Sequence, residues 1–175
     1  MTKKVIILGK SSSGKDTLRN VLIEKGLKPC VAYTTRPIRL GELDGVNYKF
    51  VDLEQYNSLK LIESESFNVA NGDTWWYGKT KETIEEADVF ICTVKGISDL
   101  LKHFSRETFF IVELECEQNV RLQRALSRGD EKKELFRRFK ADDEDFKRIR
   151  DFKVDIKVKS ENSHFYEQIF EILDI

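Results

Sequence analysis

The chain has 175 residues, which suits one domain with a proper core, and its 30 basic and 31 acidic residues give a formal charge of −1. This balance argues against a nucleic-acid partner or an acidic membrane surface, and the longest apolar runs are too short to span a membrane. The three cysteines are odd in number and widely spaced, which favours a reducing compartment over disulfides. We therefore expect a cytoplasmic protein with no export signal, either a monomer or a homodimer, whose partners are small molecules.

The first predicted strand, Val5–Leu8, leads into a loop framed by Gly9 and Gly14 and followed by Lys15. The spacing Gly-x4-Gly-Lys lets consecutive backbone N–H groups turn toward an anion, and the lysine then reaches the outer phosphates. A helix pattern follows, so that the positive helix end faces the same anion. The sequence thus predicts a phosphate-binding loop made of Gly9, Lys10, Ser11, Ser12, Ser13, Gly14, Lys15, Asp16 and Thr17.

Asp16 stands where such a loop normally carries a serine or threonine that offers its hydroxyl to Mg²⁺. A carboxylate is a hard oxygen ligand for Mg²⁺, either directly or through a bound water, so Asp16 is a candidate metal ligand. A second interpretation is equally open. Asp16 is then a first-turn acid favoured by the helix dipole, and Thr17 supplies the hydroxyl.

Strand patterns and helix patterns alternate along much of the chain. Further strands are predicted at Cys30–Tyr33, Val89–Val94, Phe109–Leu114 and Val154–Val158. This alternation predicts an α/β fold whose central parallel sheet is covered by helices on both faces and binds ligands at the carboxyl ends of its strands.

The pattern changes between the second and third of these strands. Residues 34–48 are loop-like, a helix with an aspartate cap is expected over Asp52–Glu63, and a strand over Thr74–Lys79. This stretch is too short for an independent domain, so it predicts a small lobe inserted into the core.

The segment Glu117–Asp151 is helical in pattern and rich in charge, and most of its arginines are expected on a solvated face paired with acids. Arg128-Gly129 breaks the pattern, and Arg137-Arg138 follows within ten residues. A break with guanidinium groups on both sides is typical of a hinged lid.

A second anion site is predicted in the loop that follows residue 33. Arg36 and Arg39 lie three residues apart beside Pro37, so they form a fork for a phosphate dianion, and Tyr48 can add a neutral donor. Two anion sites in one small chain indicate a donor triphosphate and an acceptor monophosphate.

With these motifs the chain resembles the guanylate kinases, and the likeness covers nearly the whole sequence. It rests on the phosphate-binding loop, on Thr-Thr-Arg-Pro-x-Arg-x-Gly-Glu-x-Asp-Gly-x-x-Tyr at 34–48, on Trp76-Tyr77-Gly78, and on Arg128-Gly129 with a later lid arginine. The resemblance implies a P-loop NTPase fold in a single domain, with a core at 1–33 and 81–175, an acceptor-binding lobe at about 34–80 and a lid at about 128–142. It also implies that Arg36, Arg39, Tyr48 and Tyr77 hold the acceptor's phosphate and that Arg128 and Arg138 close on the transferring group.

The departures from the family gather where guanine is read. The family has a small hydroxyl residue near 32, a Glu near 68, a Ser or Thr at 79 and an Asp near 93, and an ungapped alignment places Ala32, Asn68, Lys79 and Thr93 there. An asparagine amide has one donor and one acceptor, which suits an adenine or pyrimidine edge better than guanine. This alignment predicts weak base discrimination, whereas a gap that brings Glu63 or Glu65 inward would restore a guanine site.

The family also carries an acid at the end of the strand that here reads Phe90-Ile91-Cys92-Thr93, and this chain has none there. One hypothesis is that the carboxylate facing Mg²⁺ has moved to Asp16.

Together these features predict an enzyme that transfers the γ-phosphoryl group of Mg·ATP to a nucleoside monophosphate, with GMP or dGMP as the leading acceptor. Positioning and charge neutralisation dominate such chemistry, so the predicted catalytic groups are Lys15, Arg36, Arg39, Arg128 and Arg138. Asn68, Lys79 and Thr93 join the predicted acceptor site. Two alternatives stay open: a kinase of another nucleotide or small phosphate ester, and a non-catalytic module that binds proteins.

Overall fold

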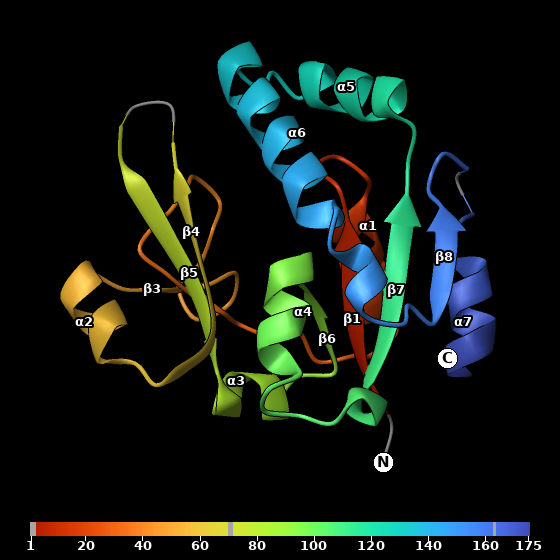
Figure 1. Ribbon diagram of the computed structural model, residues 1–175, viewed down its shortest axis with the longest axis horizontal. Coiled ribbons are helices and arrows are strands. Elements are labelled where there is room, and N and C mark those ends of the chain that lie inside the picture. The colour runs from red at the N-terminus through yellow and green to blue at the C-terminus, as the bar shows by residue number, and fades with distance from the viewer. Residues whose placement is uncertain (1–2, 70–71, 163) are drawn as a thin grey trace.

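The computed structural model describes residues 3–69, 72–162 and 164–175. Its centre is a parallel sheet in the order β6-β1-β7-β8, flanked by helices on both faces (Figure 1). The four strands are β1 (Lys4–Gly9), β6 (Val89–Ile91), β7 (Phe109–Glu115) and β8 (Ile156–Lys159). The predicted α/β architecture with a central parallel sheet is confirmed.

Successive side chains of β1 point to opposite faces of the sheet, and both faces are covered by helices. Val5 and Ile7 pack against α1 (Lys15–Glu24) and α7 (Glu167–Leu173), whereas Ile6 and Leu8 pack on the other face against α3 (Lys81–Glu85) and α4 (Val94–Leu100). Both faces of the strand are buried, so polar residues on either face would cost burial energy.

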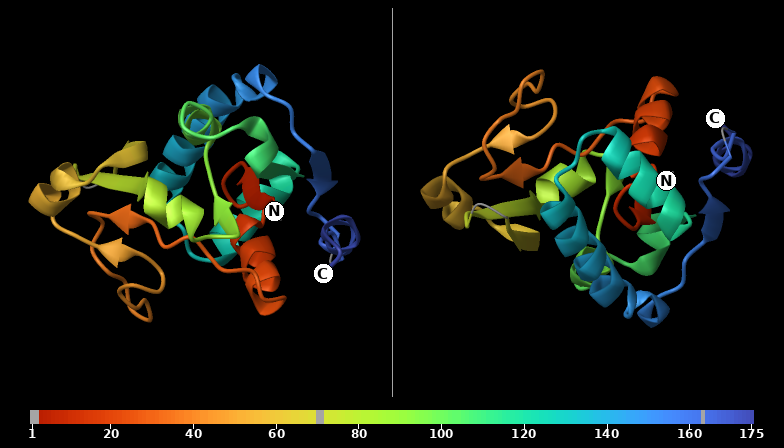
Figure 2. Two further views of the ribbon diagram at one scale, coloured as in Figure 1. Left: turned by 90° about the horizontal axis from the view of Figure 1, so that it is seen from below. Right: turned by 90° about the horizontal axis from the view of Figure 1, so that it is seen from above.

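A second sheet, in the order β3-β2-β5-β4, stands to one side of the first (Figure 2). Its strands are β2 (Tyr33–Thr34), β3 (Lys49–Phe50), β4 (Leu61–Asn68) and β5 (Thr74–Thr80), and β4 and β5 form an antiparallel hairpin. The short helix α2 (Leu53–Ser58) begins at a capping box made by Asp52 and Gln55.

Two element predictions in this region are wrong. The strand expected at Cys30–Tyr33 is not formed as such, because the Cys30 N–H donates to the Val89 carbonyl at the edge of the central sheet and only Tyr33–Thr34 pair within the second sheet. The helix expected over Asp52–Glu63 ends at Ser58, because Leu59 is extended and the following Glu-Ser alternation forms β4.

Two strand ends also differ from their prediction. β6 stops at Ile91 rather than Val94, because the Thr93 hydroxyl accepts the Gly96 N–H and caps α4. β8 begins at Ile156, two residues later than expected.

The predicted break in the charged segment separates α5 (Gln118–Ser127) from α6 (Lys132–Phe146), and Gly129 adopts the left-handed conformation with φ 80°. Both helices lie over the carboxyl ends of the central strands (Figure 1). Two single-turn 3₁₀ helices, Arg106–Thr108 and Ile149–Asp151, complete the elements. In the described part of the chain, no helix is both long and apolar enough to cross a membrane.

Candidate functional site

The loop between β1 and α1 has the backbone of a phosphate-binding loop. Gly14 has φ 95°, which only glycine adopts without strain, and a Cβ on Gly9 would lie 2.5 Å from the Ser13 hydroxyl. The Lys15 ammonium donates to the Lys10 carbonyl at 3.0 Å, which folds the side chain back over the loop. Burial lowers the pKa of Lys15, although the nearby Asp142 and Asp16 carboxylates oppose that shift.

Two arginines of α5 and Arg128, the residue that caps its C-terminal end, meet this loop at spacings of about one helical turn. Arg121 donates to the Ser11 carbonyl at 3.3 Å, Arg124 lies at hydrogen-bond distance from the Ser12 carbonyl, and Arg128 donates to the Ser12 hydroxyl at 2.9 Å. The structure therefore brings Arg128 to the loop. Arg121 is buried and Arg124 is partly buried, so the expectation of a solvated face is wrong for both. Arg121 and Arg124 are three residues apart and Arg128 follows four residues later, which places all three on one face of the helix.

Arg138, predicted to be a lid arginine, has its contacts with acids of its own segment. Its guanidinium bonds to Glu134 at 2.9 Å and lies 3.8 Å from Asp130, which also pairs with Arg128. Its neighbour Arg137 also donates to Glu134, at 2.7 and 2.8 Å, and in addition lies over the Phe67 ring of the second sheet at 5.9 Å from the ring centre. The sequence showed the arginine pair without indicating which member crosses to the other sheet.

Helix α6, in the region predicted as a lid, is tied to the loop by two consecutive acids. The Asp142 carboxylate accepts from the Ser11 N–H at 2.7 Å and from the Ser11 hydroxyl at 3.1 Å, and Asp143 pairs with the Lys10 ammonium at 2.6 Å. Burial raises the pKa of Asp142, against the hydrogen bonds from Ser11. No sequence motif marks Ser11 and Asp142 as partners, so this contact could not be predicted from the sequence.

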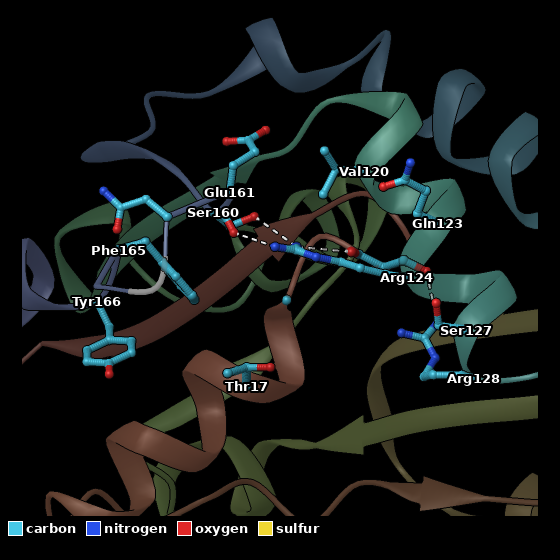
Figure 3. A pocket seen from close by; sticks show the side chains of 13 residues that line it. Thr17, Val120, Gln123, Arg124, Ser127, Arg128, Ser160, Glu161, Phe165 and Tyr166 are labelled. Carbon is cyan, nitrogen blue, oxygen red and sulfur yellow. Dashed lines mark hydrogen bonds between the residues drawn. The ribbon is translucent and has the colours of Figure 1, made fainter.

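A cavity of about 730 Å³ adjoins the phosphate-binding loop (Figure 3). Arg124 crosses it and donates to the Ser160 carbonyl at 2.6 Å. Its wall is part polar and part apolar, and includes Thr17, Val120, Arg124, Ser160, Phe165 and Tyr166. A concave space of this size and mixed character suits a small ligand whose flat apolar body carries a few polar groups.

Arg36, the first residue of the predicted phosphate fork, is held in place by hydrogen bonds within its own loop. The buried Arg36 guanidinium donates to both Glu42 carboxylate oxygens at 2.8 and 3.0 Å and to the Pro37 carbonyl. Burial alone would lower the pKa of Arg36, but the hydrogen bonds to Glu42 outweigh burial and raise this pKa. The hydrogen bonds from Arg36 in turn lower the pKa of Glu42. The pair is therefore charged, and Glu42 fixes the orientation of the guanidinium plane.

Aromatic rings surround this fork. The Tyr48 ring lies 5.4 Å from the Arg36 guanidinium and 5.8 Å from the Tyr77 ring, so the structure brings these three predicted residues together. Arg39 is exposed on the same loop, 5.9 Å from the Trp75 ring.

The pairing of the β4–β5 hairpin decides which residues share a face with Tyr77, because neighbouring residues of a strand point to opposite faces. Glu65 is paired with Tyr77 and Glu63 with Lys79, and these side chains share one face. Asn68 belongs to the alternate set with Ser64, whose hydroxyl contacts Tyr56 of α2 on the other face. Asn68 is exposed and bonds to Thr74. The structure therefore places Asn68 on the opposite face of the hairpin from Tyr77 and does not bring the two together.

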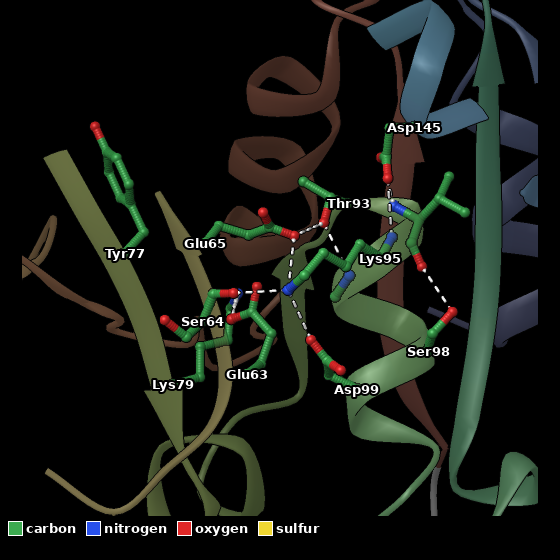
Figure 4. Close-up of polar contacts among 12 residues, drawn as sticks. Glu63, Ser64, Glu65, Tyr77, Lys79, Thr93, Lys95, Ser98, Asp99 and Asp145 are labelled. Carbon is green, nitrogen blue, oxygen red and sulfur yellow. Dashed lines mark hydrogen bonds and ion pairs between the residues drawn. The ribbon is translucent and has the colours of Figure 1, made fainter. Parts of the chain in front are cut away.

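Glu65 takes the inward place together with Thr93 (Figure 4). The Thr93 hydroxyl donates to the Glu65 carboxylate at 2.8 Å, and the Lys95 ammonium lies 3.6 Å from the same oxygen. Thr93 also caps α4, so its hydroxyl fixes Glu65 relative to the core. Burial raises the pKa of Glu65, although Thr93 and Lys95 oppose that shift.

Lys79 lies deeper than Glu65 and forms a buried ion pair with Glu63 at 2.7 Å. Burial alone would lower the pKa of Lys79, but the Glu63 carboxylate outweighs burial and holds this pKa above its ordinary value. The Glu63 side chain is only 3% exposed, whereas that of Glu65 is 16% exposed. Glu63 thus neutralises the charge of Lys79 and is closed to solvent. Glu65 is the more exposed of the two carboxylates, and a ligand can contact it.

Among the acids near the loop, Asp142 is bound to Ser11 and Asp143 to Lys10, which leaves Asp16 as the candidate metal ligand there. Asp16 is exposed in the first turn of α1, directly after Lys15. At the end of β6, where the sequence has no acid, Asp145 of α6 accepts from the Val94 and Lys95 N–H groups at 2.8 and 3.0 Å. Among the described residues, no group of three or more His, Cys, Asp or Glu side chains could hold a metal ion. A single carboxylate beside substrate phosphates still fits Mg²⁺, which keeps several waters and binds phosphates directly.

Comparison with known proteins gives a consistent result. The family model described as guanylate kinase matches residues 1–157. A guanylate kinase of Caldanaerobacter subterraneus subsp. tengcongensis is 32% identical over 147 residues, covering 78% of this chain and 70% of that relative. A guanylate kinase of Photobacterium profundum is 28% identical over 180 residues, covering 97% of this chain and 78% of the relative.

A solved structure agrees with the fold. The crystal structure of guanylate kinase from Anaplasma phagocytophilum matches with a TM-score of 0.68 at 21% identity, covering 99% of this chain and 85% of that chain. The predicted P-loop NTPase fold is confirmed by this likeness.

Proposed function

This chain belongs to the guanylate kinase family, and from that membership we propose that it transfers the γ-phosphoryl group of ATP to GMP or dGMP, releasing ADP. The enzyme is a phosphotransferase. The observation that carries the proposal is the pair of anion sites on one molecule, the loop at Gly9–Lys15 and the Arg36 fork, with Glu65 beside the second.

The donor is assigned to the phosphate-binding loop and the adjoining cavity. The loop's N–H groups and Lys15 hold the phosphates, and the cavity beside Thr17 and Arg124 holds the nucleoside. Arg128 already contacts the loop, and Arg138 lies beside Arg128 because both pair with Asp130. After a modest rearrangement of the lid, both arginines neutralise charge on the transferring group.

The acceptor is assigned to the inner face of the inserted lobe. Arg36 and Arg39 hold its phosphate together with the hydroxyl groups of Tyr48 and Tyr77. The guanidinium of Arg36 has five N–H donors, of which Glu42 and Pro37 use three. Donors are therefore left for phosphate oxygens without breaking the pair with Glu42.

The base is assigned to Glu65. A carboxylate accepts two neighbouring N–H donors, the pattern that guanine offers through N1–H and its exocyclic amine, whereas the adenine edge lacks it. Thr93 supports this carboxylate, and Lys79 lies behind it in its ion pair with Glu63. This assignment replaces the expectation of weak discrimination that followed from Asn68.

The residues present fit Mg²⁺ at the donor phosphates, and Asp16 is the residue assigned to hold it. When bound, the ion neutralises phosphate charge. Asp16 is next to Lys15 and exposed, so its carboxylate is open to an ion or its water shell.

We expect Asp16→Ser to raise the Mg²⁺ concentration needed for half-maximal activity, because the swap removes the carboxylate assigned to the ion. A magnesium titration at saturating ATP measures this, with Asp16→Asn as a variant of matched size. An unchanged or lower requirement would reject the metal role and leave Asp16 as a first-turn acid of α1.

The function is tested by comparing kcat/KM for GMP, AMP, CMP, UMP and their deoxy forms with ATP as donor and ADP release as readout. GMP or dGMP is expected to rank first. If another monophosphate ranks first, the protein is a kinase of that nucleotide, and the base assignment to Glu65 is wrong. If ADP release follows no monophosphate, the non-catalytic module is the better description.

The cellular location stays a prediction. Cys30, Cys92 and Cys116 are free thiols, in keeping with the reducing cytoplasm expected from the sequence.

A further inference from the structure

The contact between Asp142 and Ser11 places a carboxylate on the loop that binds the donor's phosphates. Both carboxylate oxygens are used, one by the Ser11 N–H at 2.7 Å and one by the Ser11 hydroxyl at 3.1 Å. A carboxylate held through a backbone N–H and a hydroxyl copies two of the contacts that a phosphate oxygen makes in such a loop.

The surroundings of Asp142 are those of an anion site. Its side chain is 18% exposed, and the Arg121 guanidinium lies 3.6 Å from the carboxylate. Arg121 is buried, stacks on the Phe139 ring of α6 at 4.5 Å, and its Nε has no hydrogen-bond partner among the described residues. Lys15 contributes a second positive charge nearby. Two cations and two Ser11 donors thus surround one carboxylate.

Asp142 projects from α6, the lid helix that Asp143 also ties to Lys10. Three residues further along the same C-terminal end of α6, Asp145 accepts from the first N–H groups of α4. Asp142 and Asp143 therefore hold the end of α6 on the loop, and Asp145 holds it on α4.

We propose that Asp142 is an intramolecular competitor of the donor's outermost phosphate, and that it thereby sets the affinity of the protein for ATP relative to ADP. The carboxylate and a γ-phosphate are both anions that need the Ser11 donors, Lys15 and Arg121, so one excludes the other. Binding of ATP then releases Asp142 from Ser11, and this frees the lid helix to rearrange. The proposal relies on the proposed function only for the identity of the donor.

The test is the dissociation constant for ATP and for ADP, each with Mg²⁺, measured by calorimetry without an acceptor. Asp142→Asn keeps the size of the side chain and removes its charge. We expect this variant to bind ATP about tenfold more tightly than the parent chain, because ATP no longer has to displace a charged hydrogen-bond partner of Ser11. The affinity for ADP is expected to change less than about threefold, because ADP lacks the outermost phosphate.

The matched control is Glu144→Gln, which removes one negative charge from the same helix at a side chain that is 63% exposed and pairs with Lys147. It is expected to bind ATP as the parent chain does. Asp142→Ala is a second variant, to be used if Asp142→Asn does not fold, and thermal unfolding of both variants checks their folding. Asp142→Ala is also expected to bind ATP more tightly than the parent chain.

Weaker or unchanged ATP binding in both folded Asp142 variants would overturn the proposal, and so would an equal gain for ATP and ADP. If the parent chain binds no ATP at all, the proposed function fails instead, and the two failures are therefore distinguishable.

Discussion

Lys15→Ala is expected to lower kcat by about a hundredfold or more while the binding of GMP stays measurable. Lys15 is the cation of the phosphate-binding loop, and its side chain is folded back onto the Lys10 carbonyl at 3.0 Å, within the loop itself. The variant removes the charge that faces the transferring phosphate and touches nothing in the inserted lobe. Steady-state kinetics with ATP and GMP measure the loss, and equilibrium titration with GMP measures acceptor binding.

A matched control is Lys28→Ala, which removes an exposed lysine that lies 4.0 Å from Glu86. Its kcat is expected to stay near that of the parent chain. If Lys15→Ala keeps near-full turnover, the kinase assignment is wrong. If it loses GMP binding as well as turnover, the loop and the acceptor lobe are coupled more tightly than their separate contacts indicate.

The phosphate-binding loop was predictable because its chemistry is local. Gly9, Gly14 and Lys15 act through the backbone of one short loop, so their spacing in the sequence determines their spacing in space. The central strands were predictable for a related reason, since burial on both faces leaves uninterrupted apolar runs such as Val5–Leu8.

The acceptor side depends on register, which a sequence shows poorly. A strand alternates its faces with every residue, so an error of one position in aligning β4 exchanges Glu65 for a residue on the outer face. The length of the hairpin loop between β4 and β5 sets this register. An alignment without gaps follows only distance along the chain and selects Asn68, whereas the pairing of the strands places Glu65 opposite Tyr77.

Long-range contacts of the lid were the least predictable. Asp142 and Ser11 are 131 residues apart, and nothing in either segment marks them as partners. Arg121 and Arg124 could have been found, because they precede Arg128 by seven and four residues and so share its helix face. The abundance of acids nearby favoured a solvated interpretation instead.

The register of β4 can be tested by function. Glu65→Gln is expected to lower kcat/KM for GMP by about a hundredfold or more, because an amide offers one acceptor where guanine needs two, and its NH₂ group opposes a guanine donor. Activity with AMP is expected to be low in the parent chain and to change little in the variant. The same side-chain size keeps the contact with Thr93 possible, and thermal unfolding of the variant checks that the fold is retained.

Asn68→Ala is the matched control on the same strand, three residues away and on the opposite face. Its kcat/KM for GMP is expected to stay within about twofold of the parent value, since exposed substitutions of this kind have small effects. The reverse pattern, with GMP use lost in Asn68→Ala and kept in Glu65→Gln, would contradict the base assignment. It would mean that the hairpin shifts its register when the acceptor binds, and that the ungapped alignment describes the bound state.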